Sequence, residues 1–214
     1  SILTRPGVKS GGEAAGGFNV RGGATDQNLV LFNGGTVYNP SHLFGMFSGF
    51  NPDIANDIEL YKCSIPVEYG GRISSVLDVK SREGNNKNMA GSLSAGLLTA
   101  KGHIEGPVGD KTTFIAAARA TYSDWLLGLL PQDSEYRNGT ASFYDITAGV
   151  THKFNERNSM QLNGYLSDDA FKFSVDTSYR YSNMNASLRW NSNFSDRNSM
   201  VATVGYDRYG YSTV

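Results

Sequence analysis

The stretch of sequence that decides the fold covers residues 144–160 and reads YDITAGVTHKFNERNSM. From Tyr144 onward, every second residue is apolar or suited to an apolar surface, and the residues between them are polar or small. This period of two indicates a β-strand with two different faces. The last seven letters read as a polar turn, and they return as FSDRNSM at residues 194–200, again between alternating runs. The sequence therefore predicts a series of antiparallel hairpins with long strands.

Several features favour a membrane barrel over a soluble β-protein. The alternating runs last about ten residues, which is the length of a tilted membrane strand, whereas an ordinary strand has about five or six. The apolar face carries aromatic residues near its ends, as at the membrane–water boundary. Residues 183–193 carry asparagines and Arg189 on the other face, and burying such a row without partners would be costly.

The connections between these runs favour the same interpretation. Short turns at 109–111, 155–158 and 195–198 alternate with long connections at 126–140 and 168–182, as in outer-membrane barrels. The alternative is a soluble all-β protein such as a propeller, in which one blade packs four short strands into about 40 residues. Here a similar length holds two long strands.

Composition narrows the class of protein. The chain has 214 residues and a net charge of −1 with 18% charged residues, so nothing indicates a nucleic-acid partner. Its one cysteine, Cys63, excludes an internal disulfide and is expected to be a small buried hydrophobe. The sequence predicts about six barrel strands, fewer than the roughly eight that a spanning barrel needs. We therefore expect the chain to be part of a longer polypeptide.

The first 84 residues differ from the rest. Two short strands at 28–32 and 36–38 flank Asn33-Gly34-Gly35, a strong signal for a tight hairpin turn. Asn51 and Pro52 predict the start of a short helix, and residues 58–63 and 76–80 read as strands. The sequence thus predicts a small α+β domain at 1–84, a polar linker at 85–88, and antiparallel transmembrane β-barrel strands at 89–214.

The sequence contains none of the common signatures of an enzyme or a cofactor site. It has neither a phosphate-binding loop nor a dinucleotide fingerprint. His42, His103 and His152 are too scattered for a metal site, and no nucleophile stands beside a base. Asp168 and Asp169 fall in a predicted long loop, where solvated surface carboxylates are expected. We expect no enzymatic activity, no cofactor and no metal.

Seven motifs between residues 6 and 122 resemble, in the same order, the plug domain and first barrel hairpin of TonB-dependent outer-membrane transporters. They read GFNVRGG (17–23), DQNLVLFNG (26–34), VYNP (37–40), IELYK (58–62), YGGRISSVLDV (69–79), EGPV (105–108) and ARATY (118–122). The sequences of these motifs are most similar to those of the Bacteroidetes branch of the family, outside its sugar-utilisation subgroup.

The resemblance implies a large barrel of about 22 strands, filled by its N-terminal plug. It implies active import of a medium-sized ligand (siderophore, corrinoid, glycan or peptide) across the bacterial outer membrane. The implied partners are outer-membrane lipid, the extracellular ligand, and a TonB-type energy-transducing protein that contacts a segment upstream of the plug. Two alternatives stay open: an outer-membrane structural or adhesion barrel without transport, and a soluble β-rich binding module.

The resemblance also implies roles for individual residues. Arg21 matches an arginine that locks the plug to barrel carboxylates, and Lys62 stands where a second arginine is common, although lysine lacks the arginine fork. We expect the contact between plug and barrel to be mainly polar and hydrated. The glycines expected in plug turns are Gly22, Gly34, Gly70 and Gly71. The residues expected to face the ligand, in the apical loops 23–27 and 38–47, are Asp26, Gln27, Tyr38, Asn39, His42, Phe44 and Phe47.

Overall fold

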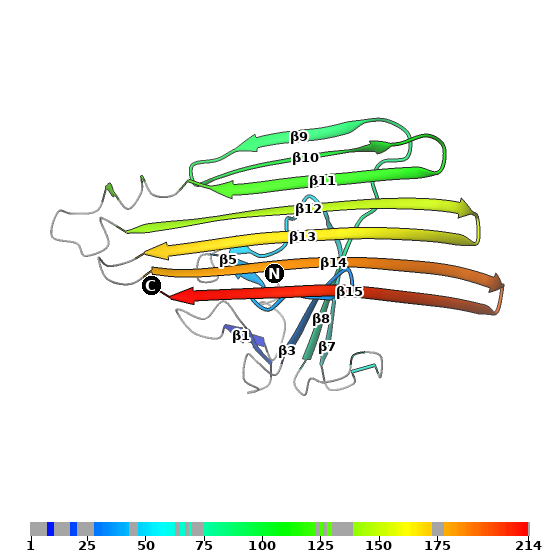
Figure 1. The fold of residues 1–214 in the computed structure, drawn as a ribbon, viewed down its shortest axis with the longest axis horizontal. Helices are drawn as coiled ribbons and strands as arrows, with labels where there is room; N and C mark the ends of the chain where they lie inside the picture. The colour runs from blue at the N-terminus through cyan, green and yellow to red at the C-terminus, as the bar shows by residue number, and fades with distance from the viewer. Residues whose placement is uncertain are drawn as a thin grey trace.

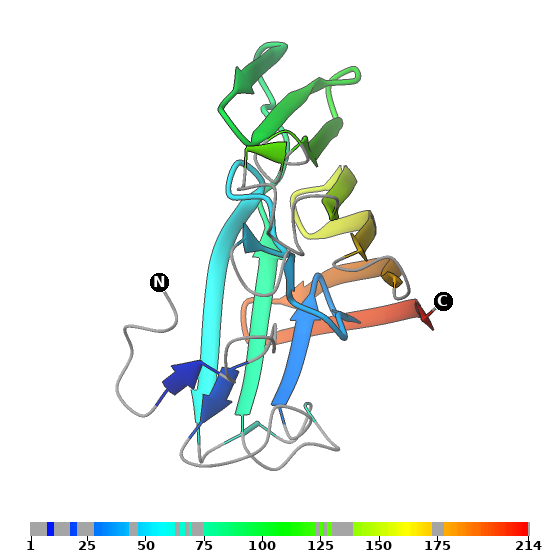
Figure 2. The ribbon, with the colours of Figure 1, turned by 90° about the vertical axis from the view of Figure 1, so that its left-hand side faces the viewer.

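The structure, a computed structural model, describes residues 8–10, 18–20, 28–42, 47–62, 65–66, 69, 75–122, 125, 128–129, 139–172 and 178–213. It contains one large antiparallel sheet and a smaller N-terminal unit that lies against one face of this sheet (Figures 1 and 2). None of the described residues forms a helix long and apolar enough to cross a membrane.

The large sheet has seven strands, and each strand pairs with the next one along the chain. Short turns at 108–111, 156–157 and 196–197 join strands at one end, on the right in Figure 1. The other end carries one further short turn, at 96–98, and the longer connections at 122–139 and 173–177. The strands are β9 (Ala90–Ala95), β10 (Thr99–Pro107), β11 (Thr112–Thr121), β12 (Thr140–Asn155), β13 (Asn158–Lys172), β14 (Ser178–Ser195) and β15 (Asn198–Thr213).

The two faces of the large sheet differ as predicted. Leu162, Leu166 and Leu188 are exposed on the outer face, while Asn163 and Asn183 are buried on the inner face. The inner face is the one that the N-terminal unit covers (Figure 2). The prediction of a sheet with apolar side chains outside and polar side chains inside is therefore confirmed.

One prediction about this sheet is wrong. The connection expected at 168–182 is mostly strand, because β13 continues to Lys172 and β14 begins at Ser178. Asp168 and Asp169 thus lie in β13, and Asp169 is buried because its side chain faces the N-terminal unit. The sheet has seven strands where about six were predicted, and β9 (AGSLSA) is too rich in small residues to show an apolar period.

The N-terminal unit is built on a four-stranded sheet of order β4-β3-β8-β7, in which β3 and β8 run parallel. Its strands cross the long strands at a steep angle (Figures 1 and 2). Two small hairpins, β1–β2 and β5–β6, accompany it. The bounds are β1 (Val8–Ser10), β2 (Phe18–Val20), β3 (Asn28–Phe32), β4 (Gly35–Thr36), β5 (Ser41–His42), β6 (Phe47–Ser48), β7 (Ala55–Lys62) and β8 (Ser75–Ser81).

Of the two local predictions for this unit, the hairpin turn is confirmed and the short helix is wrong. The predicted hairpin turn is present between β3 and β4, with positive φ of 50° at Asn33 and 86° at Gly34, as a primed turn needs. The helix predicted from Asn51 is wrong. The side chain of Asn51 does accept a hydrogen bond from the Asp53 amide, but only one turn forms before β7 begins at Ala55 and pairs with β8.

The two bodies share one apolar core. Phe32, Phe50 and Val79 of the N-terminal unit form a buried cluster with Ile115 and Tyr165 of the large sheet. The rings of Phe32 and Tyr165 are 5.6 Å apart. The expectation of a mainly polar contact is therefore wrong at this point, because Ile115 and Ala117 of β11 and Tyr165 of β13 place apolar surface at inward positions.

Candidate functional site

The contact between the N-terminal unit and the large sheet is the candidate site, and its most buried part surrounds His42. This residue ends β5 and has no exposed surface. Its Nδ1 lies 2.7 Å from Asp169 Oδ2, and its Nε2 lies 3.5 Å from Asp145 Oδ2. The imidazole stacks on Phe143 with 4.2 Å between ring centroids. One side chain of the N-terminal unit thus joins two strands of the sheet.

The surroundings of His42 favour its charged form. Burial lowers the pKa of the imidazole, but the nearby carboxylates of Asp145 and Asp169, which lie 3.5 and 2.7 Å from its two nitrogens, raise it more. The net result is a pKa above the ordinary value of 6.5. The two carboxylates therefore favour the protonated form of His42.

Arg119 of β11 completes the charge balance. Its Nε and Nη2 each lie 2.7 Å from Asp145 Oδ2, and Nη2 also donates a hydrogen bond to the backbone oxygen of Ser48 at 2.6 Å. We call His42, Arg119, Asp145 and Asp169 the histidine cluster. Two cations face two carboxylates in it, so the buried charge is neutralised inside the cluster, as buried ions require.

A second ionic contact holds the end of β8. The guanidinium of Arg82 pairs through both terminal nitrogens with the carboxylate of Glu105 in β10, with Nη2 at 2.9 Å from Oε1. The Nε of Arg82 donates to the backbone oxygen of Asp53, whose side chain is 2.8 Å from Lys101 Nζ. We call Arg82, Glu105, Asp53 and Lys101 the arginine anchor. A bidentate pair of this kind fixes both position and orientation.

An aromatic group lies near the end of the sheet that carries the long connections. Tyr38 is 55% exposed, and its ring centroid is 5.5 Å from that of Tyr209. The ring centroids of Tyr181 and Tyr211 are 5.1 Å apart. We call these four residues the tyrosine rim. The backbone nitrogen of Tyr38 also donates to Asn183 Oδ1, which places the rim directly beside the N-terminal unit.

Residues 2–76 match the family model described as the TonB-dependent Receptor Plug Domain. This match covers 75 of the 214 residues and identifies the N-terminal unit as a plug domain of the TonB-dependent receptor type. The large sheet that follows corresponds to barrel wall in such receptors, which lie in the bacterial outer membrane. No curated protein matches the chain.

Solved structures share the fold of this receptor. The alcaligin receptor FauA of Bordetella pertussis aligns over 100% of the chain at 11% identity, with a TM-score of 0.69. The ferric preacinetobactin receptor BauA of Acinetobacter baumannii aligns over 97% at 12% identity and a TM-score of 0.68. A variant of the ferric enterobactin receptor PfeA of Pseudomonas aeruginosa aligns over 97% at 15% identity and a TM-score of 0.68. The chain spans 36%, 34% and 37% of these structures, respectively.

The receptor's orientation follows from its connections. In outer-membrane barrels the short turns face the periplasm and the long loops face outward. The tyrosine rim and the histidine cluster therefore lie toward the extracellular side of the wall, near the ends of β13 and β15.

The structure describes four of the residues predicted to face a ligand. Tyr38 is exposed and Asn39 is half-buried. Phe47 packs 5.3 Å from the ring of Phe143, and His42 is buried against the wall. His42 thus occupies a different place from the one that the loop prediction assumed, whereas ligand contact by the other three stays a prediction. Asp26, Gln27 and Phe44 lie outside the described residues.

The predicted lock and turn residues are mostly beyond what the structure describes. Arg21, Gly22, Gly70 and Gly71 lie outside the described residues. Lys62 is described only as the last backbone position of β7. Gly34 occupies the second position of the β3–β4 turn. The locking role of Arg21 and Lys62 and the domain bounds at 84 and 88 stay predictions.

Sequence reasoning missed the histidine cluster and the arginine anchor. The one available signal was charge at inward positions of a wall strand, as at Arg119 in the run AAARAT or Asp145 in YDIT. The partner of such a charge could not be read from the sequence, because His42 and Asp169 are 127 positions apart.

Proposed function

We propose that the receptor imports a medium-sized ligand across the outer membrane by TonB-dependent displacement of its plug. The observation that carries this proposal is the histidine cluster, a buried ionic contact between a plug hairpin and three wall strands. A plug held by ionic contacts is closed at rest, and breaking a buried pair by removing one partner costs several kcal/mol. Transport through such a plug requires an outside source of work, which the TonB-type protein would supply.

A ferric siderophore is the ligand class that we propose first. FauA, BauA and PfeA are named for alcaligin, preacinetobactin and enterobactin. The tyrosine rim supports an amphipathic ligand, because its rings offer flat apolar faces together with phenolic hydroxyl groups. Corrinoids, glycans and peptides stay as further candidates of similar size.

The proposal is tested with the complete gene in a bacterial host that lacks its own siderophore receptors. Cells receive iron-55 as the alcaligin, preacinetobactin or enterobactin chelate, in the presence or absence of TonB. We expect uptake of at least one chelate that requires TonB, and weaker binding of that chelate after Tyr38→Ala. Binding without TonB-dependent uptake of any chelate would instead support a barrel that does not transport siderophores.

A further inference from the structure

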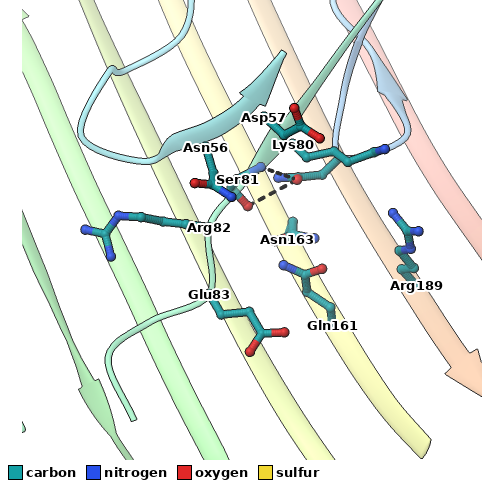
Figure 3. Close-up of a pocket in the computed structure, with 10 residues that line it drawn as sticks. Asn56, Asp57, Lys80, Ser81, Arg82, Glu83, Gln161, Asn163 and Arg189 are labelled. Atoms are coloured by element: carbon teal, nitrogen blue, oxygen red, sulfur yellow. Dashed lines mark hydrogen bonds between the residues drawn. The ribbon is translucent and has the colours of Figure 1, made fainter. Parts of the chain in front are cut away.

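A polar chamber lies between the plug and the barrel wall, away from both the histidine cluster and the tyrosine rim. Its volume is about 290 Å³, and Figure 3 shows that plug residues lie on one side of it and wall residues on the other. The plug contributes the β3–β4 turn, the start of β7 and the end of β8, and the wall contributes β13 and β14. The lining residues used below are Asn33, Lys80, Glu83, Gln161, Asn163 and Arg189.

The amide of Asn163 gives the main evidence that this chamber holds something polar. Asn163 is 3% exposed and lies at the wall side of the chamber (Figure 3). Neither its Oδ1 nor its Nδ2 has a hydrogen-bond partner among the described residues, and the Nδ2 of Asn33 has none either. Buried amide groups are nearly always hydrogen-bonded to protein, water or ligand. Water or solute in the chamber would supply those partners.

The charged residues around the chamber are largely engaged elsewhere. Arg82 is bound to Glu105, and its side chain points away from the chamber in Figure 3. Lys80 pairs with Glu59 and Asp78.

Glu83 pairs with Lys153 at 2.9 Å. Arg189 donates through Nε to the neutral Asn191, and Asp57 also lines the chamber, so one cation and one carboxylate offset each other there. The other groups that face the space are amides and a hydroxyl, from Asn163, Gln161 and Ser81. Such a lining suits a neutral solute that both donates and accepts hydrogen bonds.

The chamber lies in the periplasmic half of the wall. Gln161 is the fourth residue of β13 after the short turn, and Arg189 lies six residues before the end of β14. At about 3.3 Å per residue, both are within roughly 20 Å of the periplasmic turns. Glu83, the second residue of the connection from β8 to β9, is exposed at the same end.

We propose that this chamber is an inner site of the transporter, which holds neutral, hydrogen-bonding solute on the route from the lumen to the periplasm. The role in transit rests on the proposed import function. A volume of 290 Å³ corresponds to about ten water molecules at roughly 30 Å³ each. It is at the lower limit of ordinary ligand pockets, which begin at about 300 Å³. A hydroxyl- or amide-bearing part of a ligand therefore fits at rest, and a whole ligand passes only when the plug moves.

The first test uses thiol labelling of the full-length receptor in outer-membrane vesicles, with Cys63→Ser as the background. The probe is 2-hydroxyethyl methanethiosulfonate, which is small and neutral. Asn163→Cys reports on the chamber, and Gln161→Cys is a second position in case Asn163→Cys fails to assemble. Ala117→Cys, in the buried apolar core of the same interface, is the matched inaccessible control, and Asn193→Cys is the exposed control.

We expect the chamber cysteines to react within about tenfold of the Asn193→Cys rate, and Ala117→Cys to react at least ~100-fold more slowly, because thiol reactivity follows access to water. The labelling rate of the chamber cysteines, divided by that of Asn193→Cys, should also be higher for the neutral probe than for its anionic 2-sulfonatoethyl analogue. Chamber cysteines as inert as Ala117→Cys would overturn the site. A preference for the anionic probe would overturn its neutral character.

The second test addresses transit. Asn163→Cys is modified with a bulky maleimide, and uptake of the iron-55 chelates described above is measured together with their binding to whole cells. We expect uptake to fall at least tenfold while binding is unchanged. Unchanged uptake after complete modification would overturn the transit role. If no chelate enters even the unmodified cells, siderophore import itself fails, and labelling still decides whether the inner site exists.

Discussion

Replacing His42 with alanine should loosen the apical hairpin of the plug from the wall. The substitution removes the hydrogen-bond partner of Asp169, which is 1% exposed, while Asp145 keeps Arg119. Breaking a buried ion pair on one side costs about 3–5 kcal/mol, because an uncompensated charge stays in the interior. The local opening equilibrium should therefore rise on the order of a hundredfold or more.

Hydrogen exchange of the full-length receptor, followed by mass spectrometry, measures this effect. Peptides that cover residues 38–50 should lose protection in His42→Ala, while peptides from β12 should change less. His152→Ala is the matched control, since His152 is half-buried and forms a hydrogen bond with Thr112 of the neighbouring wall strand. Adding Asp169→Asn to His42→Ala should restore most of the protection, because no unpaired charge is then buried. Unchanged protection in His42→Ala would refute the ionic account of the contact.

The same contact should depend on pH. The pKa of His42 is raised in the docked plug above 6.5, so the stability it adds is fully present below pH 6.5. This stability is lost as the pH rises through the raised pKa of the docked state. Exchange of residues 38–50, corrected for the intrinsic rate, should therefore accelerate with rising pH in the wild type. It should not do so in the double variant His42→Ala/Asp169→Asn, and a pH response in that variant would assign the effect to another group.

Three further substitutions test the anchor, the hairpin turn and the outer face. Arg82→Ala should destabilise the plug by about 3 kcal/mol and make residues 82–89 accessible to limited proteolysis. Arg82→Lys should recover little of this stability, because lysine lacks the bidentate fork of arginine. An Arg82→Lys variant as resistant to proteolysis as the wild type would contradict this. Gly34→Ala should cost at least ~1–2 kcal/mol, since φ is 86° and its added Cβ would lie 2.9 Å from Thr203 Cγ2. Gly109→Ala is the control for backbone strain alone, because Gly109 has a φ of 73° but an added Cβ would meet no neighbouring atom. Thermal denaturation measures the loss of stability in both glycine variants. Leu188→Arg on the membrane face should cost about 2–4 kcal/mol in urea-dependent folding into vesicles, and an effect no larger than that of Leu188→Ala would argue against lipid contact.

Much of the barrel wall could be predicted because its information is local. Alternation between Leu162 and Asn163, or between Met184 and Asn185, assigns each side chain to a face without any knowledge of the neighbouring strand. The Asn33-Gly34 turn is local in the same way, since it depends on positive φ at two successive residues. Strand ends were less predictable. Asp169 looks like a loop residue in the sequence because it is charged, but it lies in β13 and pairs with His42 of the plug.

The candidate site depended on information that is not local. His42 was expected to face a ligand because its loop resembles an apical loop, yet it lies between Asp145 and Asp169 of two wall strands. The short helix expected at Asn51 failed for a related reason. The cap is a local interaction, whereas the pairing of β7 with β8, which ended the helical turn at Ala55, links segments some twenty residues apart.

The sequence by itself determined that the second half of this protein is a two-faced antiparallel sheet and that a different, smaller unit precedes it, because period and turn chemistry act between near neighbours in the chain. That this smaller unit is similar to a plug came from the resemblance of its motifs to a known family. Only the tertiary structure decided which buried charges meet, where the plug is fastened, and where amides of the wall are left to face a chamber. Those contacts join residues that are far apart in the chain, and their energy exists only once burial has removed the charges and amides from bulk water.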